Sequence, residues 1–553
     1  MNVVEFPYGE RLLSEYVKKY AEDMPKKVAV NYYGREITYQ ELDESSDRLA
    51  AAIAAMGYKK GDCMAAFVQS CALSFMIYLA AMKVGLIVVP IDPMSREFEL
   101  EYFLSDSGAK LIATMDTLYP LLLTLKHKCK IKDVITISFR DYLPERPTLP
   151  IHKIMQSEKQ TFEDAYDCLR LIEATEPNPP KVDVALSDCG FILYTGGTTG
   201  WPKGCVHSQH DLILGGLGEG KFNLNKASKD DVMLSPWPLT HISGISFSIG
   251  APFLFGMTVI QLARWDAKTA MEAIQRYKVT LTLLTTSSYN EIINHPEIKN
   301  YDLTSLRVSL IIAFVMPITD GIVNKWEEIT KCPVYDFGYG SSETMNYFAY
   351  GWGLPFPRPL CTGRFRLVPG AQIRILDFET KEEVAEEQEG EIVIKTPAQL
   401  KEYWNKPEEN KRDIVDGWVH THDRGYIKDG IVYFIGKESE IVKVSGYTVS
   451  LKEIEMFGTR HPAIEKIAVI AVPHARKGNE LKAFVILKRN AEVTASEIEE
   501  WFKGKVAVFK SPIVEIRNEL PLSGKGEILK RVLIKEELEK RGSKLPRSRP
   551  TRH

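Results

Sequence analysis

The chain has 553 residues, more than one hydrophobic core usually organises, so its length predicts two or more domains. Apolar residues make up 44% and charged residues 26%, and the net charge of −3 gives no reason to expect nucleic acid or a membrane surface as a partner. Eight cysteines occur without a C-x-x-C pair. This pattern argues against a structural zinc site and a disulfide scaffold, and favours reduced thiols in a cytoplasmic protein.

Neither the start of the chain nor its most apolar stretches predict a membrane-directed segment. Met1 to Glu10 carry acidic residues and a proline instead of a basic and then apolar run, so no signal peptide is expected. The stretches Cys71 to Pro90 and Ile242 to Ile260 are interrupted by a lysine or by glycines and a proline. Each predicts a buried helix followed by a strand rather than a membrane span.

Helical and extended patterns alternate through the first part of the chain. The spacing of apolar residues predicts helices over Tyr39–Met56 and Ala72–Val84, and strands over Cys63–Val68, Leu86–Ile91, Thr258–Leu262, Val279–Leu284 and Leu306–Phe314. This alternation predicts parallel sheets covered by helices. Shorter strands at Glu389–Ile394 and Ile431–Ile435 indicate an antiparallel region, with the acidic run Glu382 to Glu391 as a solvated hairpin turn.

A polar segment from Gly436 to Glu440 predicts a domain boundary. The pattern after it is helix, strand, strand, helix, over Leu451–Gly458, Ile464–Val472, Leu481–Leu487 and Ala495–Lys503. This is the size of a compact α+β domain. We therefore expect a large N-terminal domain over residues 1–436, a small domain over 437–541, and a disordered basic tail over 542–553.

Glycine and threonine are concentrated in one 11-residue stretch, Tyr194 to Gly204. It follows the apolar strand Phe191–Leu193 and precedes a helix for which Ser208 would be the N-cap. Its glycines allow backbone N–H groups to point into one concavity, its threonine hydroxyls donate further hydrogen bonds, and Lys203 adds a positive charge. The spacing is not that of a Walker A loop. We predict a loop that binds the phosphates of a nucleotide.

The order of residues in this loop resembles the signature Tyr-Thr-x-Gly-Thr-Thr-Gly-x-Pro-Lys-Gly of the adenylate-forming superfamily, which includes acyl-CoA synthetases, luciferases and peptide-synthetase adenylation domains. Further motifs follow in that family's order from about Tyr39 to Lys530. The resemblance implies an α/β multidomain fold. A large N-terminal domain of α/β sheets with a small β-barrel-like part would precede a small mobile α+β C-terminal domain. ATP, Mg²⁺ and the co-substrate CoA are also implied.

The resemblance assigns ATP or AMP binding to three regions of this chain. They are the loop residues Thr195, Gly196, Gly197, Thr198, Thr199, Gly200 and Lys203; the segment Phe337, Gly338, Tyr339, Gly340, Ser341 and Ser342; and Asp423, Lys437 and Lys443. In Tyr339-Gly340-Ser341-Ser342-Glu343 the tyrosine would pack on adenine, Ser342 would bind the α-phosphate, and Glu343 would hold Mg²⁺ together with Thr198. Asp423 would accept hydrogen bonds from the ribose hydroxyls. Lys437 replaces an arginine. It keeps the positive charge but lacks the forked guanidinium that can bind two oxygens at once.

The same resemblance indicates which residues would contact the acid and the thiol, and which residue would be the hinge. The acyl pocket is expected to comprise Trp237, His241, Ile312, Ala313, Phe314 and Met345, with His241 as the gating side chain. CoA would contact Ser445, Gly446 and Tyr447, with Gly446 lining the pantetheine tunnel, and Ser439 would be the hinge. Residues 312–315 replace the family's usual Gly-Gly-Ala-Pro, and their larger side chains predict a shortened acid pocket. His422 replaces a glycine, which we interpret as reshaping the turn rather than as a catalytic base.

One departure falls on a catalytic position. The segment Pro521 to Ile528 resembles a motif whose last lysine bridges the carboxylate and the α-phosphate, and here that position is Glu527. Either Lys525 or Lys530 supplies the charge from a shifted loop, or adenylation is slow and the chain mainly forms thioesters. We expect Lys525 to act, which gives Lys203, His241, Glu343 and Lys525 as the catalytic set.

The implied reaction joins a carboxylic acid to CoA. An ATP-dependent, AMP-forming acid:CoA ligase would work through an acyl-adenylate on a short- or medium-chain acid, hydroxy and aryl acids included. Two alternatives stay open: an enzyme that loads the pantetheine of a carrier protein, and a nucleotide-binding homologue impaired in adenylation. The expected partners are small molecules only, with no nucleic acid and no membrane span, and a homo-oligomer is compatible with the sequence.

Overall fold

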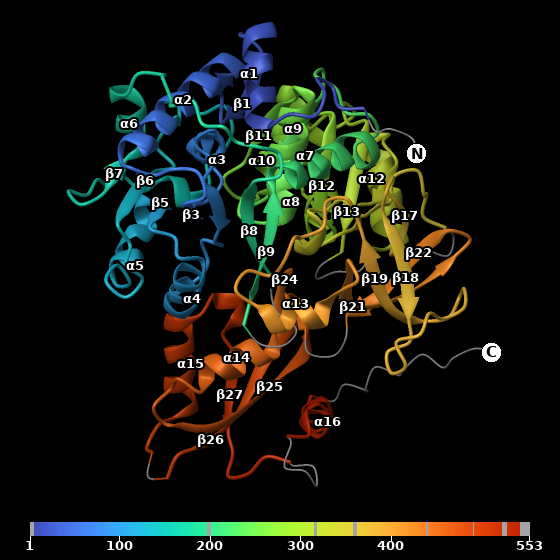
Figure 1. The fold of residues 1–553 in the computed structure, drawn as a ribbon. Helices are drawn as coiled ribbons and strands as arrows, with labels where there is room; N and C mark the ends of the chain where they lie inside the picture. Colours follow the sequence, from blue (N-terminus) through green and yellow to red (C-terminus); the bar gives the residue numbers. More distant parts are fainter. Residues whose placement is uncertain are drawn as a thin grey trace.

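The computed structural model describes residues 5–195, 201–313, 318–357, 362–437, 441–489, 491–521 and 528–541. Figure 1 shows a large body built from the first three quarters of the chain, with the C-terminal segments lying against one end of it. Within the described ranges, no helix is both long enough and apolar enough to cross a membrane. The expected tail over 542–553 lies outside the described residues.

The first of two seven-stranded sheets has the strand order β7-β6-β5-β3-β4-β8-β9. Its strands are β3 (Cys63–Phe67), β4 (Ile87–Pro90), β5 (Leu111–Met115), β6 (Asp133–Ile137), β7 (Tyr166–Asp167), β8 (Cys189–Thr195) and β9 (Lys203–Ser208). All neighbours are parallel except β8 and β9, which form an antiparallel hairpin. The phosphate loop is therefore the connection of a hairpin.

The second seven-stranded sheet has the order β14-β13-β12-β10-β11-β1-β2. Its strands are β1 (Val28–Tyr32), β2 (Arg35–Thr38), β10 (Val232–Ser235), β11 (Thr258–Gln261), β12 (Leu281–Thr285), β13 (Val308–Ile312) and β14 (Val334–Asp336). Only the β1–β2 pair is antiparallel. Parallel strands need crossover helices, so both sheets are covered by helices as the sequence pattern predicts.

Twelve α-helices belong to this double-sheet body among the described residues. They are α1 (Leu13–Asp23), α2 (Tyr39–Ala55), α3 (Ala72–Val84), α4 (Glu97–Ser107), α5 (Tyr119–Leu123), α6 (Cys168–Ala174), α7 (Gln209–Gly218), α8 (Ile242–Gly244), α9 (Ala251–Phe255), α10 (Ala267–Tyr277), α11 (Thr286–Ile293) and α12 (Asp320–Thr330). Two π-helical turns, Glu219–Asn223 and Ile245–Gly250, extend α7 and α8. The two apolar stretches tested as membrane spans are thus buried helix-then-strand units.

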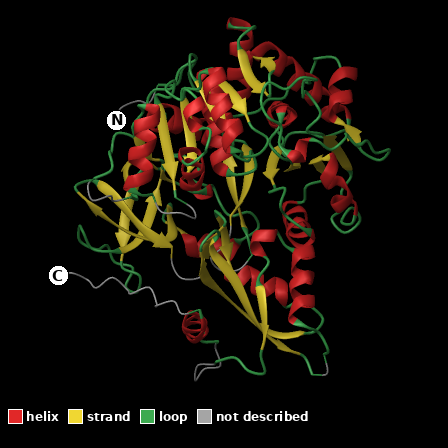
Figure 2. Ribbon diagram, turned by 180° about the vertical axis from the view of Figure 1, so that it is seen from behind, coloured by secondary structure: helices red, strands yellow, loops and turns green. Residues whose placement is uncertain are grey.

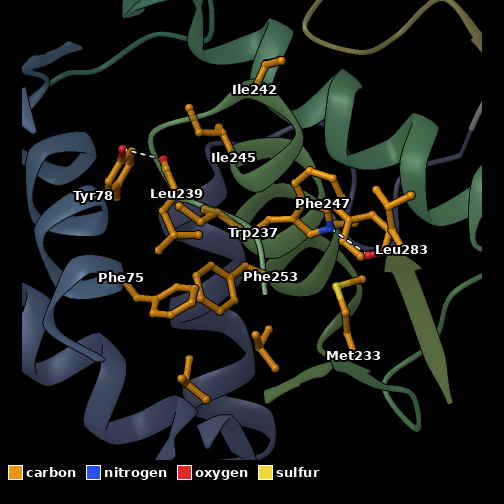
Figure 3. Close-up of a cluster of buried hydrophobic side chains, with 14 of the residues drawn as sticks. Phe75, Tyr78, Met233, Trp237, Leu239, Ile242, Ile245, Phe247, Phe253 and Leu283 are labelled. Atoms are coloured by element: carbon orange, nitrogen blue, oxygen red, sulfur yellow. Dashed lines mark hydrogen bonds between the residues drawn. The ribbon is translucent and has the colours of Figure 1, made fainter. Parts of the chain in front are cut away.

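The core between the sheets is dense and aromatic. Figure 3 shows Trp237 between Phe247 and Phe253, with its indole Nε1 donating to the carbonyl of Leu283 over 2.8 Å. The Tyr78 hydroxyl donates to the carbonyl of Leu239 over 2.7 Å. These bonds satisfy polar groups that burial would otherwise leave without water, and they fix the segment that leads to His241.

The third layer is an eight-stranded antiparallel sheet that carries the site's remaining motifs. Its strands are β15 (Gly338–Tyr339), β16 (Ala349–Tyr350), β17 (Arg364–Leu367), β18 (Gln372–Leu376), β19 (Gly390–Lys395), β20 (Ile414–Val415), β21 (Trp418–Lys428) and β22 (Ile431–Lys437), and α13 (Pro407–Asp413) packs beside it. The acidic run is solvated up to its last residue. Glu391 is an exception to that expectation, because it sits in β19 with a fully buried side chain.

The C-terminal segments form a small unit of their own. A two-stranded hairpin, β23 (Ile441–Val444) and β24 (Tyr447–Ser450), precedes a three-stranded sheet of β25 (Ile464–His474), β26 (Gly478–Leu487) and β27 (Ile513–Ile516). The helices are α14 (Leu451–Gly458), α15 (Ala495–Lys505) and α16 (Lys530–Lys540). Figure 2 shows this unit, from behind, below the body. Its core includes Phe98 of α4, and Trp201 packs against it, so the two parts share an apolar contact.

Candidate active site

A cavity of about 650 Å³ lies where the body, the antiparallel sheet and the C-terminal unit meet. Predicted site residues from all three parts line it: Thr195, Lys203, Trp237, His241, Ile312, Phe337, Gly338, Gly340, Ser341, Ser342, Glu343, Lys443, Ser445, Gly446 and Tyr447. These residues are separated by up to 250 positions in the sequence. The fold therefore brings together nearly every motif that the sequence singles out.

The phosphate loop is described only at its two ends. Gly196, Gly197, Thr198, Thr199 and Gly200 lie outside the described residues, so the predicted Thr198 metal ligand does too. Thr195 and Lys203 pair across the hairpin as the last residues of β8 and the first of β9. Ser208 caps α7, accepting from the Asp211 backbone N–H over 3.2 Å as predicted. The hairpin is tied to α4 by Tyr194, whose hydroxyl donates to Asp106 over 2.6 Å.

Lys203 is buried and already paired, which sequence reasoning missed. Its side chain is 5% exposed, and Nζ lies 2.8 Å from Oδ2 of Asp413 at the end of α13. The same Nζ lies 4.1 Å from the centre of the Tyr403 ring. Buried charged groups are usually paired, and an aromatic face attracts an ammonium further. Lys203 thus reaches the cavity wall from a fixed position.

Tyr339 and Asp423 contact each other. The tyrosine hydroxyl donates to Oδ2 of Asp423 over 2.6 Å, and the ring stacks on Phe434 with centroids 5.2 Å apart. Burial and the neighbouring Asp423 raise the pKa of Tyr339 well above its ordinary value, so the phenol stays a donor. Neither residue is among those that line the cavity; both stand behind Gly338 and Gly340, which do.

Glu343 presents a carboxylate to the cavity from a short 3-10 turn, Ser342–Thr344. The Tyr403 hydroxyl donates to its Oε1 over 3.4 Å, and the Ser341 hydroxyl accepts from the Glu343 backbone N–H over 3.3 Å. Among the described residues no group of three His, Cys, Asp or Glu side chains could hold a metal by itself. A single carboxylate facing a phosphate site fits Mg²⁺, which commonly takes one or two carboxylates and completes its shell with phosphate and water.

His241 faces the cavity from the N-cap of α8, where its Nδ1 accepts from the Ser243 backbone N–H over 3.2 Å. The imidazole is open to the cavity but enclosed by protein on its other sides. This enclosure, with the charge of Lys443 as a second cause, lowers the pKa of His241 to about 4. The side chain is therefore a neutral imidazole at physiological pH.

The turn that carries Gly446 lies at the cavity. Ser445 and Gly446 connect β23 to β24 with φ of +51° and +90°, a two-residue loop with both residues left-handed. Tyr447 stacks face to face on Phe509, with centroids 4.0 Å apart, and its hydroxyl lies 3.3 Å from the sulfur of Met94. Lys443 donates from Nζ to the Thr448 hydroxyl over 2.5 Å. Phe509 was not anticipated, because nothing in its local sequence marks it.

The predicted acyl residues divide into three groups. Trp237 and Ile312 line the cavity, whereas Phe314 lies outside the described residues. Ala313 is exposed and does not line the cavity. Met345 also differs from the expectation: it is fully buried against Gly215 of α7, and the next residue, Asn346, takes the position on the cavity wall. The backbone is left-handed at both Met345 and Asn346, with φ of +47° and +57°.

The structure describes the remaining predicted residues only in part or not at all. Lys437 ends β22, where its backbone pairs with Asp423, but its side chain is outside the description. Ser439 and the segment with Lys525 and Glu527 lie outside the described residues. Lys530 begins α16 and pairs with Glu455 over 2.9 Å. Of the residues missed from sequence, Tyr403 and Asp413 are the most consequential.

Comparisons of the sequence with family models and with known proteins agree on one family. The family model of AMP-binding enzymes matches residues 17–404, and that of the AMP-binding enzyme C-terminal domain matches residues 453–527. A long-chain-fatty-acid–CoA ligase of Bacillus subtilis is 29% identical over 97% of this chain and 96% of its own. A 4-coumarate–CoA ligase of Pinus taeda is 28% identical over 90% of this chain and 89% of its own.

Among solved structures, a double mutant of o-succinylbenzoate CoA synthetase from Bacillus subtilis, bound to a product analogue, superposes with a TM-score of 0.76. It is 22% identical and covers 94% of this chain and 98% of its own. That likeness confirms the predicted α/β multidomain fold with a smaller C-terminal part. The family match covers well over half of the sequence, and the chain belongs to the AMP-binding enzymes.

Proposed function

We propose that this protein is an ATP-dependent carboxylic acid:CoA ligase that releases AMP and pyrophosphate and works through an acyl-adenylate. One observation supports this most strongly. A single cavity is walled on one side by Lys203 and Glu343, which suit triphosphate chemistry, and on the other by the Ser445–Gly446 turn, which suits an incoming thiol. Relatives named as CoA ligases along nearly the whole chain agree with it.

The first half-reaction is attack of a carboxylate on the α-phosphate of ATP. A carboxylate is a poor electrophile until AMP replaces its oxide leaving group, so the protein mainly positions charges. Lys203 and the Thr195–Gly200 loop would hold the phosphates, Ser342 would donate to the α-phosphate, and Glu343 would hold Mg²⁺, whose charge would neutralise the phosphate oxygens. Asp423 would accept from the ribose, oriented by its bond from Tyr339.

The second half-reaction is displacement of AMP by a thiol. The thiolate would enter past Gly446, where the missing side chain leaves room, between Tyr447 and the wall that carries His241. His241 is neutral at physiological pH and can accept a proton there. Lys443 lines the same cavity and would lie beside the reacting carbonyl. CoA is preferred over a carrier-protein pantetheine because relatives matched along nearly the whole chain are named as CoA ligases.

We also propose the domain limits 1–436 and 437–541, with Ser439 as the hinge between them and a basic tail over 542–553. The small domain would rotate between the two half-reactions, because one arrangement must present the residue 525–527 loop and the other the Gly446 turn. Lys525 would supply the charge that Glu527 cannot. Pyrophosphate exchange by Lys525→Ala tests that role, and undiminished exchange would refute it.

The acid is proposed to be short or medium in length, aromatic or hydroxylated acids included. The aromatic Trp237 and the aliphatic Ile312 limit the depth of the cavity, while Ser243 and Asn346 add polar groups to its wall. A screen of AMP and pyrophosphate release with CoA, across C2 to C10, hydroxy and aryl acids, tests the proposal. Turnover with one class identifies the acid. Absence of pyrophosphate release with every acid would favour a nucleotide-binding homologue, and release of pyrophosphate without CoA consumption would favour a carrier protein.

A further inference from the structure

His422 occupies a backbone conformation that favours glycine. Its φ is +58°, in the left-handed region, where a side chain with a Cβ is strained. The neighbouring sequence resembles a pattern with glycine at this position. Such strain persists only where surrounding contacts offset it. The partners of the imidazole are therefore the groups that hold His422 in this conformation.

Those partners are two fully buried carboxylates. Nε2 of His422 lies 3.1 Å from Oδ1 of Asp413, and Nδ1 lies 3.3 Å from Oε1 of Glu391. Both carboxylates have no exposed side-chain surface, whereas the imidazole is 26% exposed toward the cavity. Carboxylates only accept hydrogen bonds, so a protonated ring nitrogen of His422 can donate to the carboxylate that it faces.

The Asp413 carboxylate joins this histidine to Lys203. Oδ2 receives the Lys203 ammonium at 2.8 Å and an Arg412 N–H at 2.8 Å, while Oδ1 faces His422. Burial alone raises the pKa of Asp413. Hydrogen bonds from Arg412 and His422 and the charge of Lys203 outweigh it and hold that pKa well below the ordinary value, so the group remains an anion.

Glu391 lies at the other end of this row of charged groups. Its Oε2 lies 3.2 Å from Nδ1 of His420 and 3.1 Å from Nζ of Lys381, and its Oε1 accepts from the His422 backbone N–H over 3.2 Å. Burial raises its pKa, yet these partners lower it to about 2. The groups form one line through the protein: Lys381, Glu391, His422, Asp413 and Lys203.

We propose that Asp413, held by His422 and Glu391, is the positioning residue for Lys203, and that His422 replaces glycine in this chain because it completes that support. The role rests on the proposed function, in which Lys203 binds ATP phosphates. A lysine side chain has four rotatable bonds, so a fixed carboxylate behind the ammonium limits where Nζ can go. Tyr403 closes the remaining side, since its ring lies under the same ammonium and its hydroxyl reaches Glu343.

The test is a double-mutant cycle on the full-length protein. Asp413→Asn keeps the shape and removes the charge. We expect it to slow acid-dependent ATP–pyrophosphate exchange by roughly 10- to 100-fold, the loss typical of a misplaced catalytic group. On a Lys203→Ala background the same substitution should cause no further loss, because its effect passes through that lysine. His422→Gly, which relieves the left-handed strain, should raise thermal stability or leave it unchanged while slowing exchange several-fold.

The control is Asp416→Asn, an exposed carboxylate three residues away, which should leave exchange unchanged. Exchange by Asp413→Asn equal to or faster than wild type would overturn the proposal, as would an equal loss with and without Lys203. Failure of the proposed function looks different: wild type itself would then show no acid-dependent pyrophosphate exchange. In that case the same cycle is read in the dissociation constant of ATP by calorimetry, where Asp413→Asn should weaken binding about fivefold only when Lys203 is present.

Discussion

Single residues in the core show how burial can decide a protonation state. Glu219 is fully buried in the π-helical turn after α7. Its carboxyl accepts from the Asn223 amide over 2.9 Å and lies 3.5 Å from the Ser246 hydroxyl. Burial raises its pKa to about 8, and these two hydrogen bonds offset only part of that rise. Since no Lys, Arg or His among the described residues forms an ion pair with it, the carboxyl is protonated at neutral pH.

This protonation predicts a stability that falls as the pH rises. The unfolded chain releases the Glu219 proton near 4.5 and the folded chain near 8. Between these values the folded state binds more protons, so stability decreases with pH by the order of a few kcal/mol. Glu219→Gln keeps an oxygen that can accept from Ser246 and cannot ionise. We expect it to raise the unfolding temperature at pH 8.5 and to change it little at pH 5.

Thermal unfolding at both pH values measures the effect. Glu382→Gln, on the exposed acidic turn, is the matched control and should show no such difference. An equal shift of Glu219→Gln at the two pH values would mean that the carboxylate is not protonated in the folded protein.

At this scale the sequence predicts residue types better than it predicts partners. Lys203, Glu343 and His241 can be found from motifs because their neighbours in the chain form a pattern. Asp413 cannot, because its contact with Lys203 spans 210 positions and nothing local marks it. Nor does residue type indicate which of Met345 and Asn346 faces the cavity, where the backbone is left-handed at both positions.

Secondary structure elements follow the sequence more closely. The helix expected over Ala72–Val84 and that over Leu451–Gly458 are found with the same bounds, because each has a clear apolar pattern and a defined end. The antiparallel pairing of β8 with β9 was not anticipated. Lys203 and Gly204 read as loop residues by composition, yet cross-strand hydrogen bonds place them in a strand.

In the proposed function, the thioester step depends on the β23–β24 hairpin. Its turn uses two left-handed residues, which matches the natural twist of the strands. Gly446→Ala adds a methyl group at φ +90° and costs about 1 kcal/mol in backbone strain. We expect it to slow the reaction of a preformed acyl-adenylate with CoA at least tenfold, with pyrophosphate exchange unchanged.

Single-turnover assays of the two half-reactions separate these effects. Gly430→Ala is the control, since Gly430 has φ +70° in another hairpin turn, where an added Cβ meets nothing within 4 Å. If Gly446→Ala slowed both half-reactions equally, strain rather than access to the cavity would be responsible. The same would follow if Gly430→Ala slowed the reactions as much as Gly446→Ala.

At the scale of the whole molecule, contacts between α4 and the C-terminal unit hold the Gly446 turn against the cavity. Glu99 of α4 accepts from the Ala507 backbone N–H over 2.9 Å and from Nζ of Lys510 over 2.8 Å. Lys510 also contacts Glu453 of its own unit at 2.9 Å. Beside them Phe98 packs between Phe457 and Trp501. Figure 1 shows α4 directly above α15.

This interface mixes one buried cation with two buried carboxylates. Burial raises the pKa of Glu453, and the charge of Glu99 raises it further against the opposing effect of Lys510. Glu99 is thus the carboxylate that the body contributes, and the small unit would lose this contact in the proposed rotation. Its loss leaves Lys510 paired with Glu453, so the small unit keeps its own ion pair.

Glu99→Ala should therefore shift the equilibrium between domain arrangements without unfolding either part. We expect the thioester-forming half-reaction to slow several-fold, because the arrangement seen here is less populated, while adenylation keeps or gains rate. Glu101→Ala on the same helix, which makes only a long 3.9 Å ion pair with Lys128, is the control. Adenylation slowed as much as thioester formation would contradict this view, since Glu99 would then support the site itself rather than one arrangement of the domains.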